Sequence, residues 1–87
     1  MKVLDIHSIQ KKDIPIYYRR EYFGRAIFET FEKKQIEKKI SFCLEQSPTG
    51  SYSIAVDVLD PLDYPMIPVI KNLKSFITDL NTKGLLP

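Results

Sequence analysis

Cysteine and histidine are nearly absent from this sequence of 87 residues, which contains only Cys43 and His7. A lone cysteine excludes an internal disulfide framework and a zinc site built from several cysteines. A nucleophilic Cys43 would need His7 beside it, and no motif places two catalytic groups together. We therefore predict that the protein is not an enzyme and that it binds no metal and no cofactor.

Long apolar runs are also missing. No stretch approaches the roughly 20 apolar residues that cross a bilayer. Asp5 and His7 interrupt the first ten residues, where a signal peptide would carry its apolar segment. We expect no membrane segment and a cytoplasmic location. The hydrophobic fraction of 44% is typical of a globular protein, and this length accommodates a single domain, residues 1–87.

Charge of one sign is not in large excess, because the net charge is only +2. Such a small value is weak support for a polyanionic partner such as nucleic acid. The basic residues gather in residues 1–39, whereas residues 40–87 carry more acidic than basic side chains. An asymmetry of this kind orients a molecule in an electric field, although most surface charges simply keep a surface hydrated.

Residues 40–58 carry the clearest signal of local structure, which is that of a β-hairpin. Pro48 suits the first central position of a type I turn, and Gly50 suits the left-handed position that closes a bulged three-residue loop. Apolar residues alternate on both sides of this loop. The loop predicts three apolar cross-strand pairs on one face: Leu44–Ile54, Phe42–Val56 and Ile40–Val58.

The segment FETFEKKQIEKK, residues 28–39, fits either a helix or a hairpin. A helix over residues 21–38 would align a mostly apolar stripe, but no Gly or Asn is present to end it. The alternation of the next strand extends back to Ile36, which favours a hairpin. We predict a strand over residues 25–32 and a tip at Lys33-Lys34-Gln35. The expected pairs are Phe28–Ile40, Ala26–Phe42 and Glu29–Lys39.

Upstream, KVLDIHSI and IPIYYRREYF are rich in the residue types of β-strands, with Lys11-Lys12-Asp13 as their connection. Gly24 is expected to mark a bulge or bend between strands. The fold class is therefore α+β: an antiparallel meander of four to five strands, followed by one C-terminal helix that packs on one face of the sheet.

The C-terminal helix is predicted from apolar residues at helical spacing. They are Met66, Val69, Ile70, Leu73, Phe76, Ile77 and Leu80. Asp63 is placed to cap or charge the N-terminus of this helix. Gly84 would end it, with Leu85 contacting Leu80 as in a Schellman motif. The apolar stripe should cover the face of the sheet that carries the predicted apolar pairs.

Residues 17–25 are the most suggestive stretch for function because tyrosine and arginine dominate protein interfaces. The candidate partner-binding residues are Tyr17, Tyr18, Arg19, Arg20, Tyr22 and Arg25. We expect a binding module that uses this strand and the uncovered sheet face to bind a protein partner or to form a homo-oligomer. A plain edge strand would carry the same residue types.

The alternative hypothesis is single-stranded nucleic acid, because aromatic rings stack on bases and cations contact phosphates. Under this hypothesis the lysine-rich tip extends the basic surface. The additional residues would be Lys33, Lys34, Lys38 and Lys39. We rank protein binding above nucleic acid because the net charge is low.

Overall fold

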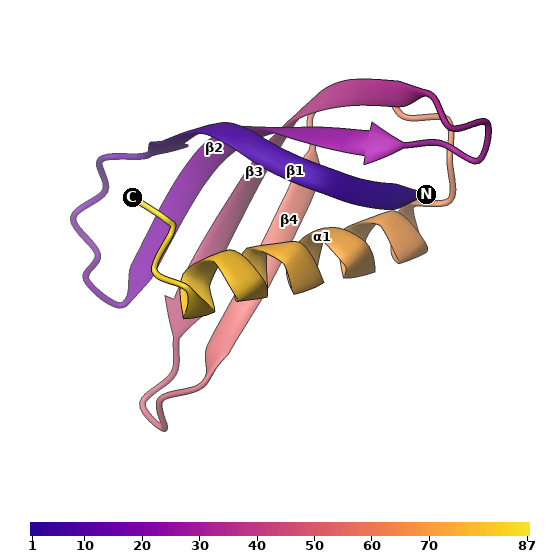
Figure 1. The fold of residues 1–87 in the computed structure, drawn as a ribbon. Coiled ribbons are helices and arrows are strands. Elements are labelled where there is room, and N and C mark those ends of the chain that lie inside the picture. The colour runs from indigo at the N-terminus through magenta and orange to yellow at the C-terminus, as the bar shows by residue number, and fades with distance from the viewer.

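Four antiparallel strands and one helix make up the computed structural model, which describes residues 1–87. The strands are neighbours in sequence order and form one open meander sheet (Figure 1). The elements are β1 (Lys2–Lys11), β2 (Arg19–Glu29), β3 (Gln35–Gln46), β4 (Tyr52–Val58) and α1 (Met66–Thr82). The predicted α+β class is confirmed, with four strands rather than five.

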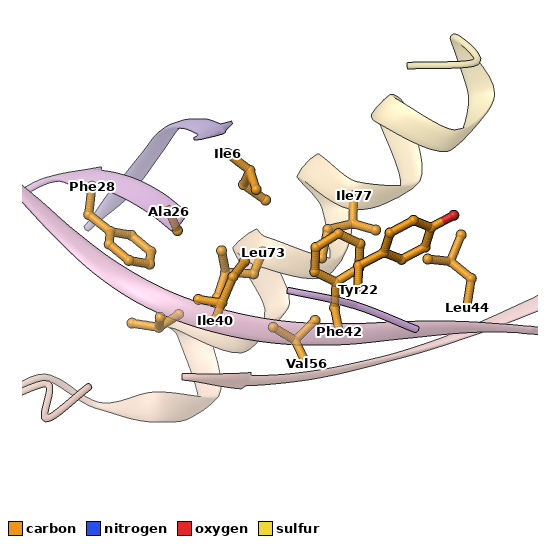
Figure 2. Packing of buried hydrophobic residues seen from close by; sticks show 11 residues of the cluster. Ile6, Tyr22, Ala26, Phe28, Ile40, Phe42, Leu44, Val56, Leu73 and Ile77 are labelled. Atoms are coloured by element: carbon orange, nitrogen blue, oxygen red, sulfur yellow. The ribbon is translucent and has the colours of Figure 1, made fainter. Parts of the chain in front are cut away.

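The hydrophobic core lies between α1 and one face of the sheet. Val69, Leu73 and Ile77 recur every fourth residue, so they form one buried stripe along α1. Alternate residues of the strands meet this stripe (Figure 2). They are Ile6, Tyr22, Ala26, Phe28, Ile40, Phe42, Leu44 and Val56. The helix covers the predicted face and lies closest to the two outer strands, so the twisted sheet curls around it.

The β3–β4 hairpin has the predicted register. Leu44 pairs with Ile54, and Phe42 pairs with Val56. Gly50 closes the loop with φ +91°, in the left-handed region that glycine tolerates best. The Ser47 N–H donates to the Ser51 carbonyl oxygen at 2.8 Å. Turn chemistry and alternation therefore predicted this hairpin correctly.

The β2–β3 segment is a hairpin, as favoured, but its predicted register is wrong. Phe28 pairs with Ile36 instead of Ile40, and Gly24 pairs with Ile40. The Thr30 N–H donates to the Lys34 carbonyl oxygen at 2.8 Å, so the loop is residues 31–33 rather than 33–35. The register moves by an even number of residues, which keeps each side chain on its expected face.

The strand predicted over IPIYYRREYF begins later, at Arg19, because residues 12–18 form a loop. The bulge expected at Gly24 lies instead in β1, where the register shifts between His7 and Gln10. Ser8 has φ +52° within that bulge. A Cβ on Gly24 would lie 3.3 Å from Ile6 Cγ2, so glycine lets the bulged strand approach closely.

The two ends of α1 differ in how well the sequence predicted them. Leu85 N–H donates to the Leu80 carbonyl oxygen at 2.9 Å and Gly84 N–H to that of Asn81 at 3.1 Å, which is the expected Schellman motif. The expectation for Asp63 is wrong. Pro65 is the N-cap residue, no side chain caps the helix, and its first turn holds no acidic residue.

Candidate functional site

The stretch of residues 17–25 is divided by the fold into three environments. β2 lies between β1 and β3, so it has no free edge and cannot pair with a partner strand. Tyr17 and Tyr18 precede β2 in the loop of residues 12–18. Within β2, successive side chains alternate between the helix-covered face and the open face of the sheet. The predicted site residues therefore do not form one surface.

Arg20 and Tyr22 point toward the helix. Tyr22 is 0% exposed, and its ring stacks on Phe42 with 5.1 Å between centroids. Its hydroxyl donates to the Pro87 carbonyl oxygen at 3.0 Å. Arg20 Nη2 donates to Asn81 Oδ1 at 2.8 Å. A partner-binding role for Tyr22 is wrong because Tyr22 belongs to the core, and Arg20 is used within the protein.

Arg19 lies on the open face among carboxylates. Its guanidinium nitrogens lie 3.2 Å from Glu21 and 3.3 Å from Glu45. Lys12 Nζ also approaches Glu21, at 3.6 Å. Cys43, Glu21 and Glu45 raise the pKa of Arg19 above its ordinary value, so this side chain stays charged at physiological pH. Arg19 is therefore a charged group that already has protein partners.

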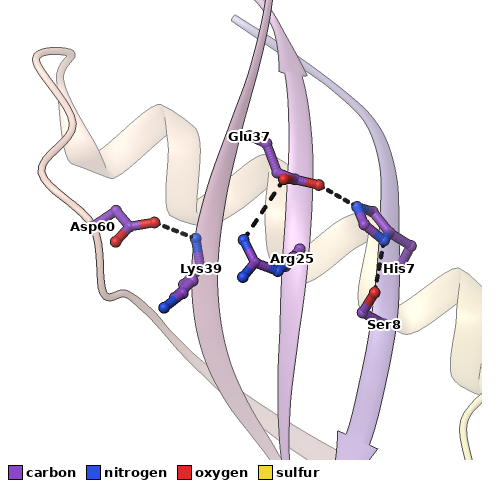
Figure 3. Close-up of polar contacts among 6 residues, drawn as sticks. All are labelled: His7, Ser8, Arg25, Glu37, Lys39 and Asp60. Carbon is purple, nitrogen blue, oxygen red and sulfur yellow. Dashed lines mark hydrogen bonds and ion pairs between the residues drawn. The ribbon is translucent and has the colours of Figure 1, made fainter.

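Arg25 belongs to a second polar cluster on the same face, which spans three strands (Figure 3). Arg25 Nη1 lies 3.6 Å from the Glu37 carboxylate. Glu37 also contacts His7 Nε2, and His7 Nδ1 lies 2.9 Å from Ser8 Oγ. The sequence identified no partner for His7, because Glu37 follows it by 30 residues and is aligned with it only by the register of the sheet.

Cys43 and His7 are not brought together. Cys43 pairs with Glu21, whereas His7 pairs with Arg25. These positions on β2 are four residues apart, which is about 13 Å along the strand. In addition, no group of three or more His, Cys, Asp or Glu side chains is arranged to hold a metal ion. The one helix does not combine the length and apolarity needed to cross a bilayer.

The four lysines of the alternative hypothesis are dispersed. Lys33 lies in the β2–β3 loop and Lys34 directly after it, with Lys34 Nζ 3.4 Å from Glu32. Lys38 and Lys39 are adjacent in β3, so their side chains point to opposite faces of the sheet. The loop that holds Tyr17 lies at the other end of the molecule (Figure 1). β2 separates the two ends by about 35 Å.

Tyr17 and Tyr18 are the predicted site residues that remain at the surface without a structural role for their rings. Tyr17 is 99% exposed and Tyr18 is 49% exposed. Their rings meet edge to face with 5.8 Å between centroids. Gln46 N–H donates to the Tyr18 carbonyl oxygen at 2.8 Å, which fastens this loop to the end of β3.

A groove of about 520 Å³ lies beside the two tyrosines. Its lining consists of Tyr17, Tyr18, Glu45, Gln46, Ser47 and Pro48. Sequence reasoning missed the contribution of residues 45–48. The signal was nevertheless present, because a meander of sequential strands places the end of β3 beside the start of β2.

Comparisons with known proteins place the chain in a family. No curated protein and no solved structure matches it. The model of one protein family, which is identified by a locus code with the prefix BB, matches residues 1–82. That span contains all four strands and the helix. The chain is therefore a member of this locus-coded family.

Proposed function

We propose that this chain is a non-enzymatic binding module whose partner is a protein. Its contact surface is the tyrosine patch, defined as Ile16, Tyr17 and Tyr18. The observation that carries the proposal is the near-complete exposure of Tyr17 on a loop, next to a half-exposed Tyr18. Ile16 adds further exposed apolar surface. Three consecutive exposed apolar side chains form a surface that gains free energy when a partner covers it.

Tyrosine suits this role for physical reasons. Its ring buries a large apolar area with only two side-chain torsions to fix, and its hydroxyl keeps a hydrogen bond at the edge of the contact. The hydrogen bond from Gln46 to Tyr18 holds one end of the loop in place before a partner arrives. Such pre-organisation lowers the conformational entropy lost on binding.

The charged side chains beside the patch suit the rim of an interface better than its centre. Arg19, Glu21 and Glu45 neutralise one another on the open face. Burying such a cluster carries a desolvation penalty, whereas leaving it at a hydrated rim avoids that penalty. We therefore place the centre of the contact on the patch and only its border on the open face.

The same charges argue against single-stranded nucleic acid. The arginines at residues 19 and 25 are paired with carboxylates, and the lysines of the β2–β3 loop lie at the far end of the sheet. A basic track along the sheet would have to pass Glu21, Glu37 and Glu45. Repulsion between these carboxylates and phosphates supports protein as the partner class.

The proposal is tested by capture of proteins from an extract of the source cells with matched baits. A discrete protein should be retained by the wild-type chain and lost with Tyr17→Ala/Tyr18→Ala. Phe31→Ala is the matched control, because Phe31 is 83% exposed but lies in the loop at the opposite end. Retention should persist at high salt, since apolar contact carries the energy.

A second measurement separates the two partner classes. Fluorescence titration with single-stranded oligonucleotides should give no affinity tighter than about micromolar at physiological salt. Nanomolar binding that weakens steeply with salt would contradict the proposal. About four neutralised phosphates would give a log–log slope near −3.

A further inference from the structure

The two edges of the sheet differ in how they are protected. β1 is interrupted by register shifts between Val3 and Asp5 and between His7 and Gln10. Bulges of this kind disturb the regular row of hydrogen-bonding groups and discourage pairing with another strand. β4 pairs with β3 without any shift. β4 is therefore the one regular open edge of the sheet.

The outward-facing backbone groups of β4 follow from its register. Ser47 N–H donates to the Ser51 carbonyl oxygen and Leu59 N–H to that of Lys39, so odd-numbered residues form the hydrogen-bonded pairs with β3. The N–H and C=O groups of the even-numbered residues then point away from β3. These residues are Tyr52, Ile54, Val56 and Val58. No turn, loop or side-chain hydrogen bond within the chain reaches them.

We propose that β4 pairs with β4 of a second copy of this chain, antiparallel and centred on Ala55, to form a two-fold dimer with a continuous eight-stranded sheet. This inference is independent of the tyrosine patch. In this register the even-numbered residues face one another, as their outward N–H and C=O groups require. Tyr52 lies opposite Val58 of the second copy, and Ile54 opposite Val56.

The side chains of β4 are compatible with this self-pairing. On the open face Ala55 meets its own copy, and Asp57 meets Ser53 of the second copy, whose hydroxyl can donate to the carboxylate. Asp57 is the only charged residue of β4, and the register keeps the two aspartates apart. Pairing therefore brings no like charges into opposition. The irregular β1 edges at both ends of the dimer stop further growth.

A disulfide test measures the register directly. In a Cys43→Ser background, Ala55→Cys places two thiols at the two-fold axis. Their Cα atoms would be about 4.5 Å apart in a non-hydrogen-bonded pair, within the range that a disulfide spans. The Cys43→Ser change is needed because Cys43 pairs with Ala55 inside the chain. We expect a disulfide-linked dimer as the main product of mild oxidation.

The matched control is Ser53→Cys in the same background. Ser53 lies on the same face of β4 and is also exposed. The two introduced thiols would be about 13 Å apart along the strands, too far to be linked within the dimer. Equal linking of both variants, or none with Ala55→Cys, would overturn the inference.

A charge test examines the same contact without covalent chemistry. Ala55 is exposed, so Ala55→Lys and Ala55→Glu should both keep the fold. Each variant alone should dimerise at least tenfold more weakly than wild type in sedimentation equilibrium, since like charges face each other at the axis. An equimolar mixture should recover the dimer as a heterodimer. Ala55→Thr should dimerise like wild type, and a wild-type chain that stays monomeric at millimolar concentration would overturn the inference.

The dimer and the tyrosine patch are separated by one further comparison. Tyr17→Ala/Tyr18→Ala should still form the Ala55→Cys disulfide, because the patch lies outside the β4 edge. Ala55→Lys should in turn still capture the partner of the patch. Loss of the disulfide in the tyrosine variant would overturn the β4 contact as a separate interface, whatever the result of the capture experiment.

Discussion

The β2–β3 and β3–β4 hairpin loops share one backbone geometry but differ at the position where it is most demanding. Each loop has three residues, with a hydrogen bond of 2.8 Å between the residues that flank it. Each also contains one left-handed residue, which is Lys33 at φ +59° in the first loop and Gly50 at φ +91° in the second. Glycine adopts this conformation freely, whereas for a lysine with its Cβ it costs about 1 kcal/mol.

The lysine is tolerated because other contacts hold its loop. Thr30 is buried at 9% exposure and its Oγ1 accepts a hydrogen bond from Lys34 N–H at 3.2 Å. In the second loop Ser47 is exposed, and its hydroxyl contacts only the exposed side chains of Thr49 and Ser51. The second loop is therefore determined by its left-handed glycine, and the first by its flanking threonine.

The largest effect should come from Gly50→Val. A β-branched side chain in the left-handed region should lower the free energy of unfolding by about 2 kcal/mol, although the structure leaves open space around the new Cβ. Urea denaturation followed by circular dichroism measures this change. Thr49→Val in the same loop is the control and should remain within about 0.5 kcal/mol of wild type. An unchanged midpoint for Gly50→Val would show that the left-handed position does not determine this loop.

A smaller loss is expected for Thr30→Val, which keeps the shape of the side chain and removes the acceptor for Lys34 N–H. The expected decrease in unfolding free energy is about 1 kcal/mol, because this hydrogen bond is partly buried. Ser47→Ala at the equivalent position should change the unfolding free energy by about half as much or less, since its partners are solvated. Equal losses at the two positions would remove the distinction between the loops.

The smallest effect should be a gain of stability in Lys33→Gly. Relief of the left-handed strain should raise the unfolding free energy by about 0.5 kcal/mol, after subtraction of the larger chain entropy that glycine brings to the unfolded state. Lys33→Ala is the control that removes the same charge without the conformational relief. A Lys33→Gly protein no more stable than Lys33→Ala would mean that Lys33 is not strained.

The difference between the two loops also explains which registers could be predicted from the sequence. At β3–β4, Gly50 and the alternation of Ile54 and Val56 with Phe42 point to one register. At β2–β3, alternation predicts the faces but not the register, because a shift by two or four residues keeps every side chain on its face. Polarity places the lysines at the tip, while the structure puts exposed Phe31 there and ends the loop with a strained lysine.

The candidate site was predictable only in part. Tyr17 and Tyr18 are exposed as expected, but the burial of Tyr22 depends on where β2 starts and on which face the helix covers. No local signal gives the bulge at Ser8 or the contact between His7 and Glu37, since both depend on how β1 aligns with β2 and β3. Helical spacing and the Schellman glycine are local, so α1 was predicted well.

The contacts of Arg20 and Tyr22 with the end of the chain have a consequence for the order of folding. They join residues separated by 61 and 65 positions, whereas the pairs of the three hairpins join near neighbours in sequence. Closing a longer loop loses more chain entropy, so the hairpins should form first and α1 should dock in a late step. We expect the hydrogen bonds of Arg20 and Tyr22 to form after the rate-limiting barrier. Their removal should then accelerate unfolding and leave the folding rate nearly unchanged.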